Sequence, residues 1–329
     1  MGRSTPADGR FATMDALRGV AAVCVMLFHA EASFALHMTG GFLAVDLFFC
    51  LSGFVIAHAY EQRLRNGFST REFLLRRAVR LWPMLALGAV LGIMLHGGHA
   101  GMLFLLPNWK SPTLLFPANP PLWSLMFEML AYFAFALLLY RSKSIALFAI
   151  MAVSALVLIN MAFSPGRFAD FGADWPSIVG GLARVGYGFT AGVLIYRRQN
   201  IDRRQTGNGA WLPIGLAVVG FLTIGTADNN AAVVAALIGV PLIVAWTARI
   251  EVPQRRSAAV LGDLSYPLYC VHVPLIALAA GGGDLAIAGA CAAIAALSLA
   301  LDRFCDKPAR VWLLARVQQA RPRAAVPAA

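Results

Sequence analysis

The chain has 329 residues, of which 59% are hydrophobic and only 13% carry a charge. Soluble domains contain about 25% charged residues, so this composition excludes an ordinary soluble protein and predicts an integral membrane protein. The net charge of +11 would by itself suit a nucleic-acid-binding protein. The lysines and arginines are instead spread over alternate loops between apolar stretches, which excludes nucleic acid as a partner.

The apolar stretches predict an all-α polytopic membrane protein with about ten transmembrane helices. At about 20 residues for each span, a chain of this length has room for roughly ten. The third, seventh and ninth stretches are short, so they are candidates for broken helices. The predicted spans cover residues 14–34, 41–60, 81–97, 122–140, 145–163, 178–196, 211–226, 231–248, 266–280 and 285–301.

The positive charges predict the orientation of these spans. Of the 27 lysines and arginines, only Lys110 and Arg167 fall in loops on one side, and only Arg18 and Arg184 fall within spans. All the others lie on the opposite side. Positive residues concentrate on the cytoplasmic side of membrane proteins, so both termini are predicted to be cytoplasmic.

Three segments follow from this topology. Residues 1–13 form a cytoplasmic N-terminal segment without a cleavable signal peptide, residues 14–312 form the transmembrane domain, and residues 313–329 form a disordered cytoplasmic tail. The apolar, proline-rich loop between the third and fourth spans is expected to pack back against the protein. The five scattered cysteines form no CxxC pair, so no metal site or disulfide framework is predicted.

Ionisable residues inside the spans are the candidates for function, because a charge in hydrocarbon is costly. In the first span, Arg18 and His29 are eleven residues apart, which places both on one helical stripe about 16 Å apart in height. Asp15 lies one turn from Arg18 and can pair with it. The other candidates are Glu31, Asp46, His58, Glu128, Arg184 and His272.

His29, Asp46 and Glu128 are predicted to share one level toward the outer leaflet, from their distances to the span ends. A carboxylate beside an imidazole fixes its tautomer and raises its basicity, which suits a general base. The alternative interpretation is that these groups are polar contacts between helices.

A second candidate group lies at the cytoplasmic side. Arg76, Arg77 and Arg80 precede the third predicted span and share a helical face. Their guanidinium groups could hold the phosphates of a cytoplasmic ligand, or they could contact anionic lipids. His272 is predicted near the inner end of the ninth span, where it could join this group.

Several motifs at these positions resemble the acyltransferase-3 family of membrane acyltransferases. MDALRGVAAVCVMLFH contains the arginine, ten residues and histidine of that family, and GGFLAVDLFFCLSGFVIAHAY is similar to its second span. RRAVRLWP, PLWSLMFE, LARVGYGFTAGVLIY, LGDLSYPLYCVHVPL and DKPAR resemble later motifs in the same order. The resemblance covers about residues 11–312. Met14, Ala44 and Asp306 stand where the family usually has Phe, Gly and Glu.

The resemblance implies an O-acyltransferase of the bacterial inner membrane that moves an acyl group, usually acetyl from acetyl-CoA, onto a carbohydrate hydroxyl. It implies no permanently bound cofactor. The implied partners are acyl-CoA, a carbohydrate acceptor, membrane lipids and polysaccharide-assembly proteins. A small-molecule glycoside remains an alternative acceptor.

Roles for the candidates follow from this resemblance. His29 would take the acceptor proton with help from Asp46 or Glu128, and Arg18 would orient the donor or stabilise the tetrahedral intermediate. The acyl-CoA donor would be bound by Arg76, Arg77, Arg80 and His272. Direct transfer and an acyl-enzyme on Ser52 or Ser124 both stay open.

Two other classes of function stay open beside the enzyme. Intramembrane arginines, histidines and carboxylates also build proton-coupled transporters. A non-catalytic membrane scaffold is the third alternative. Consumption of acetyl-CoA by the purified protein would distinguish an enzyme from both.

Overall fold

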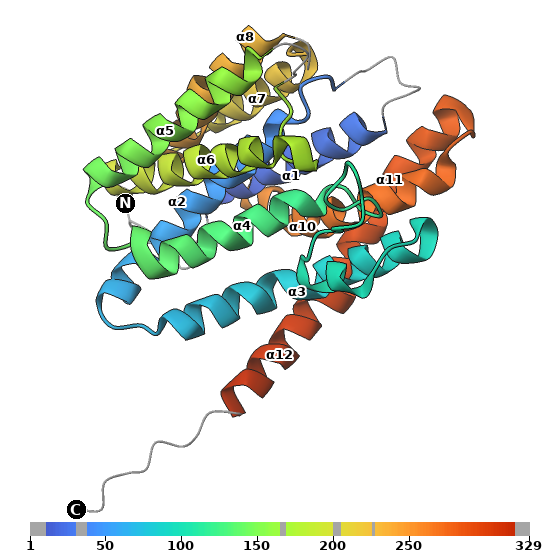
Figure 1. Ribbon diagram of the computed structural model, residues 1–329, viewed down its shortest axis with the longest axis horizontal. Helices are drawn as coiled ribbons and strands as arrows, with labels where there is room; N and C mark the ends of the chain where they lie inside the picture. Colours follow the sequence, from blue (N-terminus) through green and yellow to red (C-terminus); the bar gives the residue numbers. More distant parts are fainter. Residues whose placement is uncertain (1–10, 31–37, 165–168, 200–204, 226–227, 320–329) are drawn as a thin grey trace, which may run out of the picture.

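The chain forms a bundle of long helices that run side by side in the computed structural model (Figure 1). The structure describes residues 11–30, 38–164, 169–199, 205–225 and 228–319. The elements are α1 Ala12–His29, α2 Leu43–Arg65, α3 Thr70–His96, η1 Ala100–Phe104, α4 Leu122–Ala134, η2 Phe135–Leu139, α5 Ser144–Ala162, η3 Trp175–Ser177, α6 Ile178–Arg198, β1 Gln205–Thr206, η5 Asn208–Ala210, α7 Trp211–Thr223, α8 Asn229–Val234, η6 Ala235–Gly239, α9 Val240–Thr247, β2 Ile250–Glu251, α10 Arg255–Ile276, η7 Ala277–Ala279, α11 Gly283–Leu301, η8 Asp302–Asp306 and α12 Lys307–Gln319.

The predicted all-α polytopic fold is confirmed. Nine helices of the described chain are long and apolar enough to cross a membrane, and the shorter apolar helix Asn208–Thr223 coincides with the predicted seventh span. The only strands among the described residues are the two-residue β1 and β2, which pair in parallel. Each predicted span therefore corresponds to a helix.

Several helices extend beyond their predicted limits. The third and ninth spans were expected to be short, but α3 begins at Thr70 and α10 begins at Arg255. The last span continues through η8 into α12 as far as Gln319, so the tail predicted from residue 313 begins within a helix. Residues 1–10 and 320–329 and Glu31 lie outside the described residues.

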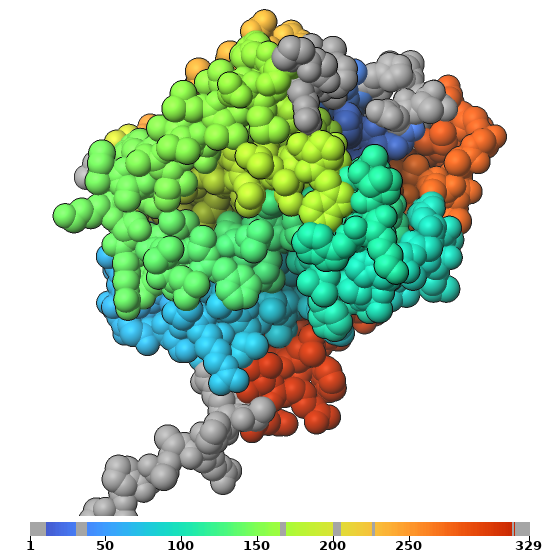
Figure 2. Space-filling view, in the orientation of Figure 1, coloured from blue at the N-terminus to red at the C-terminus, as the bar shows by residue number. Residues whose placement is uncertain are grey.

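Four helices form the interior of the bundle. α1 packs along α10, and α2 packs along α6. About two thirds of α2 is buried, whereas only 17% of α5 is buried although its sequence is strongly apolar. An apolar helix with an exposed surface is expected to face lipid, so α5 lies at the periphery. Figure 2 shows α5 on the outside of the body and α12 projecting beyond α3.

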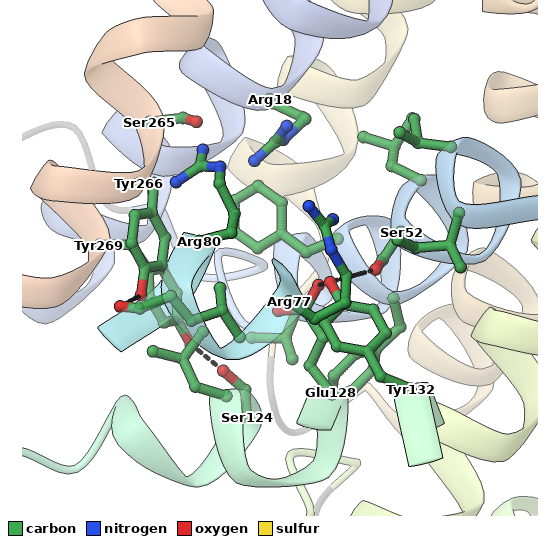
Figure 3. A pocket seen from close by; sticks show the side chains of 18 residues that line it. Arg18, Ser52, Arg77, Arg80, Ser124, Glu128, Tyr132, Ser265, Tyr266 and Tyr269 are labelled. Atoms are coloured by element: carbon green, nitrogen blue, oxygen red, sulfur yellow. Dashed lines mark hydrogen bonds between the residues drawn. The ribbon is translucent and has the colours of Figure 1, made fainter. Parts of the chain in front are cut away.

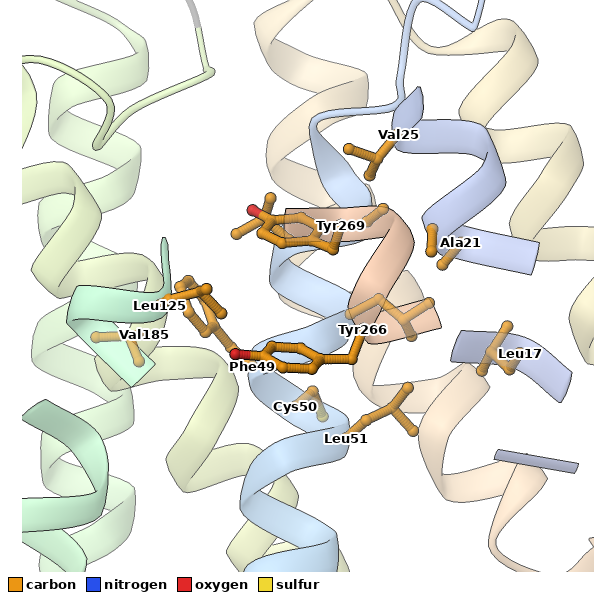
Figure 4. Packing of buried hydrophobic residues seen from close by; sticks show 14 of the residues in the cluster. Leu17, Ala21, Val25, Phe49, Cys50, Leu51, Leu125, Val185, Tyr266 and Tyr269 are labelled. Atoms are coloured by element: carbon orange, nitrogen blue, oxygen red, sulfur yellow. The ribbon is translucent and has the colours of Figure 1, made fainter. Parts of the chain in front are cut away.

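Glycines bring α2 and α6 close together. A Cβ atom at Gly53 would collide with the carbonyl oxygen of Phe189, and one at Gly192 would collide with the carbonyl oxygen of Cys50. Close backbone approach at small residues is a common way to pack membrane helices. The surrounding core is filled by side chains from α1, α2, α4, α6 and α10 (Figure 4).

The loop between α3 and α4 packs back against the protein, as predicted. Leu115 and Phe116 are fully buried. The side-chain Nδ2 of Asn119 donates to the carbonyl oxygens of Gly88 at 3.1 Å and Cys270 at 2.9 Å. Pro274 has no N–H to donate to the Cys270 carbonyl four residues earlier, so the loop supplies the missing donor.

Candidate active site

The candidate site is a cavity of about 110 Å³ between α1, α2, α3, α4 and α10. Apart from α1, which contributes one residue, each helix presents residues spaced three or four apart, which brings them onto one face. α4 contributes Ser124, Glu128 and Tyr132 in this way, and α10 contributes Ser265 and Tyr269. Arg18 comes from α1, Ser52 from α2, and Arg77 and Arg80 from α3 (Figure 3).

Three guanidinium groups meet in this cavity against one carboxylate, that of Glu128. Arg18 makes no hydrogen bond or ion pair with any residue that the structure describes. Nε of Arg77 is buried and lacks a hydrogen-bond partner in the described part of the chain. One terminal nitrogen of Arg80 is also buried without a hydrogen bond, and it lies 3.6 Å from a carboxylate oxygen of Asp306 in a long ion pair. Leaving such donors unsatisfied costs about 1–3 kcal/mol each, so the cavity is suited to an anionic ligand.

Aromatic rings hold two of these arginines in place. The guanidinium carbon of Arg77 lies 5.6 Å from the ring centre of Tyr60 and 5.8 Å from that of Tyr132. That of Arg80 lies 4.9 Å from the ring of Tyr266. A cation–π contact occupies the face of a guanidinium and leaves the N–H groups at its edge able to donate hydrogen bonds to a ligand.

A hydroxyl cluster lies beside Arg77 in the cavity lining (Figure 3). The Ser52 hydroxyl donates to Glu128 at 2.7 Å and lies 3.0 Å from the Tyr132 hydroxyl, which also donates to Glu128. Tyr132 was missed by the sequence analysis. Its position four residues after Glu128, on the same helical face, was the available signal.

Asp46 lies in a separate, buried ion pair with Arg184. The guanidinium group donates to the two carboxylate oxygens at 3.0 and 2.9 Å, and also to the carbonyl oxygens of Phe42 and Phe171, both at 2.7 Å. Asp170, in the loop before α6, completes the set at 3.1 Å. Arg184 therefore ties α2 and this loop to α6.

Asp170 is the acid of this cluster that lies outside the spans. Partial removal of water raises the pKa of its carboxyl, and the Arg184 guanidinium opposes that shift. Sequence analysis missed Asp170 because no span or motif contains it.

His29 and His272 form a third cluster. Nε2 of His272 lies 3.2 Å from Nδ1 of His29, and the ring centres are 5.0 Å apart. His272 is fully buried, whereas His29, the last residue of α1, is exposed. The pair adjoins the cavity through Tyr269, whose ring centre lies 5.9 Å from that of His272.

The predicted grouping of His29, Asp46 and Glu128 is wrong in its contacts. Asp46 binds Arg184, Glu128 binds Ser52 and Tyr132, and neither carboxylate contacts His29. His272 was placed at the inner end of its span because the span was started at residue 266. Since α10 starts at Arg255, His272 lies near the other end, beside His29 and outside the cavity lining.

The arginine group is also divided. Arg77 and Arg80 line the cavity, but Arg76 does not. Arg76 forms an ion pair with Glu72 at 2.7 Å, one turn earlier on α3. Arg18, predicted to pair with Asp15, instead points into the cavity (Figure 3).

Residues 11–301 match a protein family described as an acyltransferase domain. The chain is 47% identical to Protein 2 in picA locus of Rhizobium radiobacter over 25% of this chain and 44% of that protein. It is 27% identical to the exopolysaccharide production protein ExoZ of Rhizobium meliloti over 78% of this chain and 84% of ExoZ.

A third relative is the peptidoglycan O-acetyltransferase OatA of Listeria monocytogenes, which is 28% identical over 30% of this chain and 17% of OatA. The chain thus spans most of ExoZ but less than half of the other two relatives. No solved structure matches the chain significantly.

Proposed function

The chain belongs to the acyltransferase-3 family, and we propose that it transfers an acetyl group from acetyl-CoA to a hydroxyl of a carbohydrate such as a surface polysaccharide or lipid-linked glycan. The family supports an O-acyltransferase in a membrane. The carbohydrate acceptor is supported by the names of ExoZ and OatA, which refer to exopolysaccharide and peptidoglycan.

The observation that carries the donor proposal is the excess of positive charge in the cavity. Arg18, Arg77 and Arg80 line the cavity together with a single carboxylate, and a buried N–H group of Arg77 has no hydrogen-bond partner within the described chain. Arg80 has only a long ion pair with Asp306, at 3.6 Å, and no hydrogen bond from its buried terminal nitrogen. A phosphate-bearing donor would satisfy those groups, since guanidinium forks match phosphate oxygens. The cavity holds only part of such a donor, and the slender pantetheine arm would extend from it.

His29 is the proposed general base. It lies about 16 Å above Arg18 along α1, so an arm that starts at the arginines has to extend past Tyr269 to reach it. There the acceptor hydroxyl gives its proton to His29 while its oxygen attacks the thioester carbonyl. Arg18 steadies the donor from below.

Asp46 and Glu128 act differently from His29 in this proposal. Asp46 fixes α2 against α6 through Arg184, and Glu128 organises the hydroxyl groups of Ser52 and Tyr132 in the cavity wall. Arg76 contributes positive charge near the cavity without lining it.

The test is release of free CoA by purified protein given acetyl-CoA and a mixture of envelope glycans. Arg77→Ala should raise the donor KM about tenfold or more, because a guanidinium–phosphate contact contributes about 1.5–3 kcal/mol. Arg76→Ala should raise it less, because Arg76 is engaged by Glu72 outside the cavity. Arg71→Ala, an exposed arginine on the same helix, is the matched control.

Two results would oppose the proposal. Equal donor KM values for wild type and Arg77→Ala would remove the cavity as the donor site. An absence of CoA release from folded wild-type protein, with a broad acceptor pool supplied, would remove the activity itself.

A further inference from the structure

The histidine pair contains enough hydrogen bonds to define where its protons lie. Nδ1 of His272 is 3.0 Å from the carbonyl oxygens of both Leu268 and Tyr269. Nδ1 of His29 is 2.9 Å from the carbonyl oxygen of Val25. A carbonyl oxygen can only accept a hydrogen bond, so both Nδ1 atoms carry a proton.

The contact between the rings then has one direction. The single Nδ1–H of His29 is shared between the Val25 carbonyl oxygen at 2.9 Å and Nε2 of His272 at 3.2 Å, so Nε2 of His272 must carry a lone pair. A second proton on His272 would set two N–H groups against each other. His272 is therefore neutral, which also fits its complete burial.

We propose that His272 is a positioning residue that holds His29 as its Nδ1–H tautomer and so makes Nε2 of His29 the basic atom. This inference rests on the proposed function, in which His29 is the base. In many enzymes a carboxylate accepts a hydrogen bond from the histidine and so orients it. Here the neutral imidazole of His272 takes the place of that carboxylate. The carboxylate of Asp46, predicted to assist His29, is unsuited to this role because both its oxygens accept from Arg184.

The proton balance of the transfer follows from this arrangement. The acceptor hydroxyl gives its proton to Nε2 of His29, and its oxygen forms a bond to the thioester carbonyl carbon. The carbon–sulfur bond then breaks, and the leaving thiolate takes the proton from His29 Nε2–H. His29 Nδ1–H donates to His272 throughout, so the ring keeps its orientation while its charge changes.

The first test measures the tautomers directly in wild-type protein reconstituted in nanodiscs with ¹⁵N-labelled histidine. The ¹⁵N shifts should report the Nδ1–H form for both histidines, with peaks assigned from the His29→Phe and His272→Gln spectra. A ¹⁵N–¹⁵N coupling across the hydrogen bond should join them. An Nε2–H tautomer at His29 would overturn the proposal whatever the catalytic activity.

The second test separates positioning from a structural role. His272→Met fills the space with only the weak acceptor of a thioether sulfur and should lower kcat about 10–100-fold, the size of effect seen when an orienting partner of a functional histidine is lost. The donor KM should stay within about twofold, because the arginines of the cavity bind the donor. His272→Gln restores an acceptor atom and should recover most of kcat.

The outcomes are distinct. Equal losses in His272→Met and His272→Gln, at equal thermal stability, would contradict positioning. If the folded wild-type protein releases no CoA, the proposed function is refuted, and the NMR spectra alone decide the tautomers. If His272→Met does not fold, the His272→Gln kinetics and the wild-type spectra still decide.

Discussion

At the scale of single residues, the side chains of His29, Asp46 and Glu128 belong to three separate sets of contacts. Counting from span ends placed His29, Asp46 and Glu128 at one height, but height leaves the rotation of each helix undefined. The rotations send their side chains to His272, Arg184 and Ser52 respectively. The depth of a residue in the membrane can be estimated from the sequence. The direction in which its side chain points depends on packing between helices that are distant in the chain.

The Arg184–Asp46 pair should be essential for stability. Arg184 is 2% exposed and gives hydrogen bonds to two carboxylates and two carbonyls. Arg184→Ala leaves a buried carboxylate unpaired, which should cost about 3–5 kcal/mol of unfolding free energy. Thermal unfolding in detergent measures this loss, and Arg198→Ala, at the exposed end of the same helix, is the control.

A double variant separates the pair from the residues themselves. Asp46→Leu with Arg184→Met removes both charges of the buried pair and should lose less stability than Arg184→Ala, because the buried Asp46 carboxylate is no longer left unpaired and only the partly exposed Asp170 loses its partner. Unchanged melting of Arg184→Ala would contradict the role given to this pair.

At the scale of elements, the sequence predicted every membrane helix but set some ends wrongly. Polar and glycine residues before Tyr266 suggested a loop, yet α10 runs from Arg255 through them. Composition alone placed the start of this span at residue 266, eleven residues after the true start of α10. That error placed His272 at the wrong end of the bundle. The arginines of α3 were similarly taken as lying before a span, while they are inside a continuous helix.

The close crossing of α2 and α6 depends on glycines, which have no side chain at the contact. Gly53→Ala would place a Cβ against the Phe189 carbonyl oxygen, and overpacking of this kind costs about 1–3 kcal/mol. Gly289→Ala in α11 is the matched control, because a Cβ there meets nothing within 4 Å. The control should be neutral or stabilise the helix by about 0.5–1 kcal/mol. Equal melting temperatures for the two variants would contradict the close crossing.

At the scale of the whole molecule, composition and charge pattern were sufficient for the fold class. The positive-charge pattern predicts that the arginine cavity opens to the cytoplasm and that His29 lies toward the opposite surface. The two groups are separated by most of the length of α1. The proposed function therefore predicts that the acyl group is taken from the donor on the cytoplasmic side and delivered to the acceptor on the opposite side.

The most direct measurement uses inside-out membrane vesicles that enclose envelope glycans. Labelled acetyl-CoA, which does not cross membranes, is added outside, where the cytoplasmic face is exposed. Wild-type vesicles should accumulate label on enclosed carbohydrate as alkali-labile ester, and His29→Ala vesicles with equal protein should lose about 10²–10⁴-fold of that rate. Label that appears equally with His29→Ala, or no label on carbohydrate in wild-type vesicles, would contradict the account.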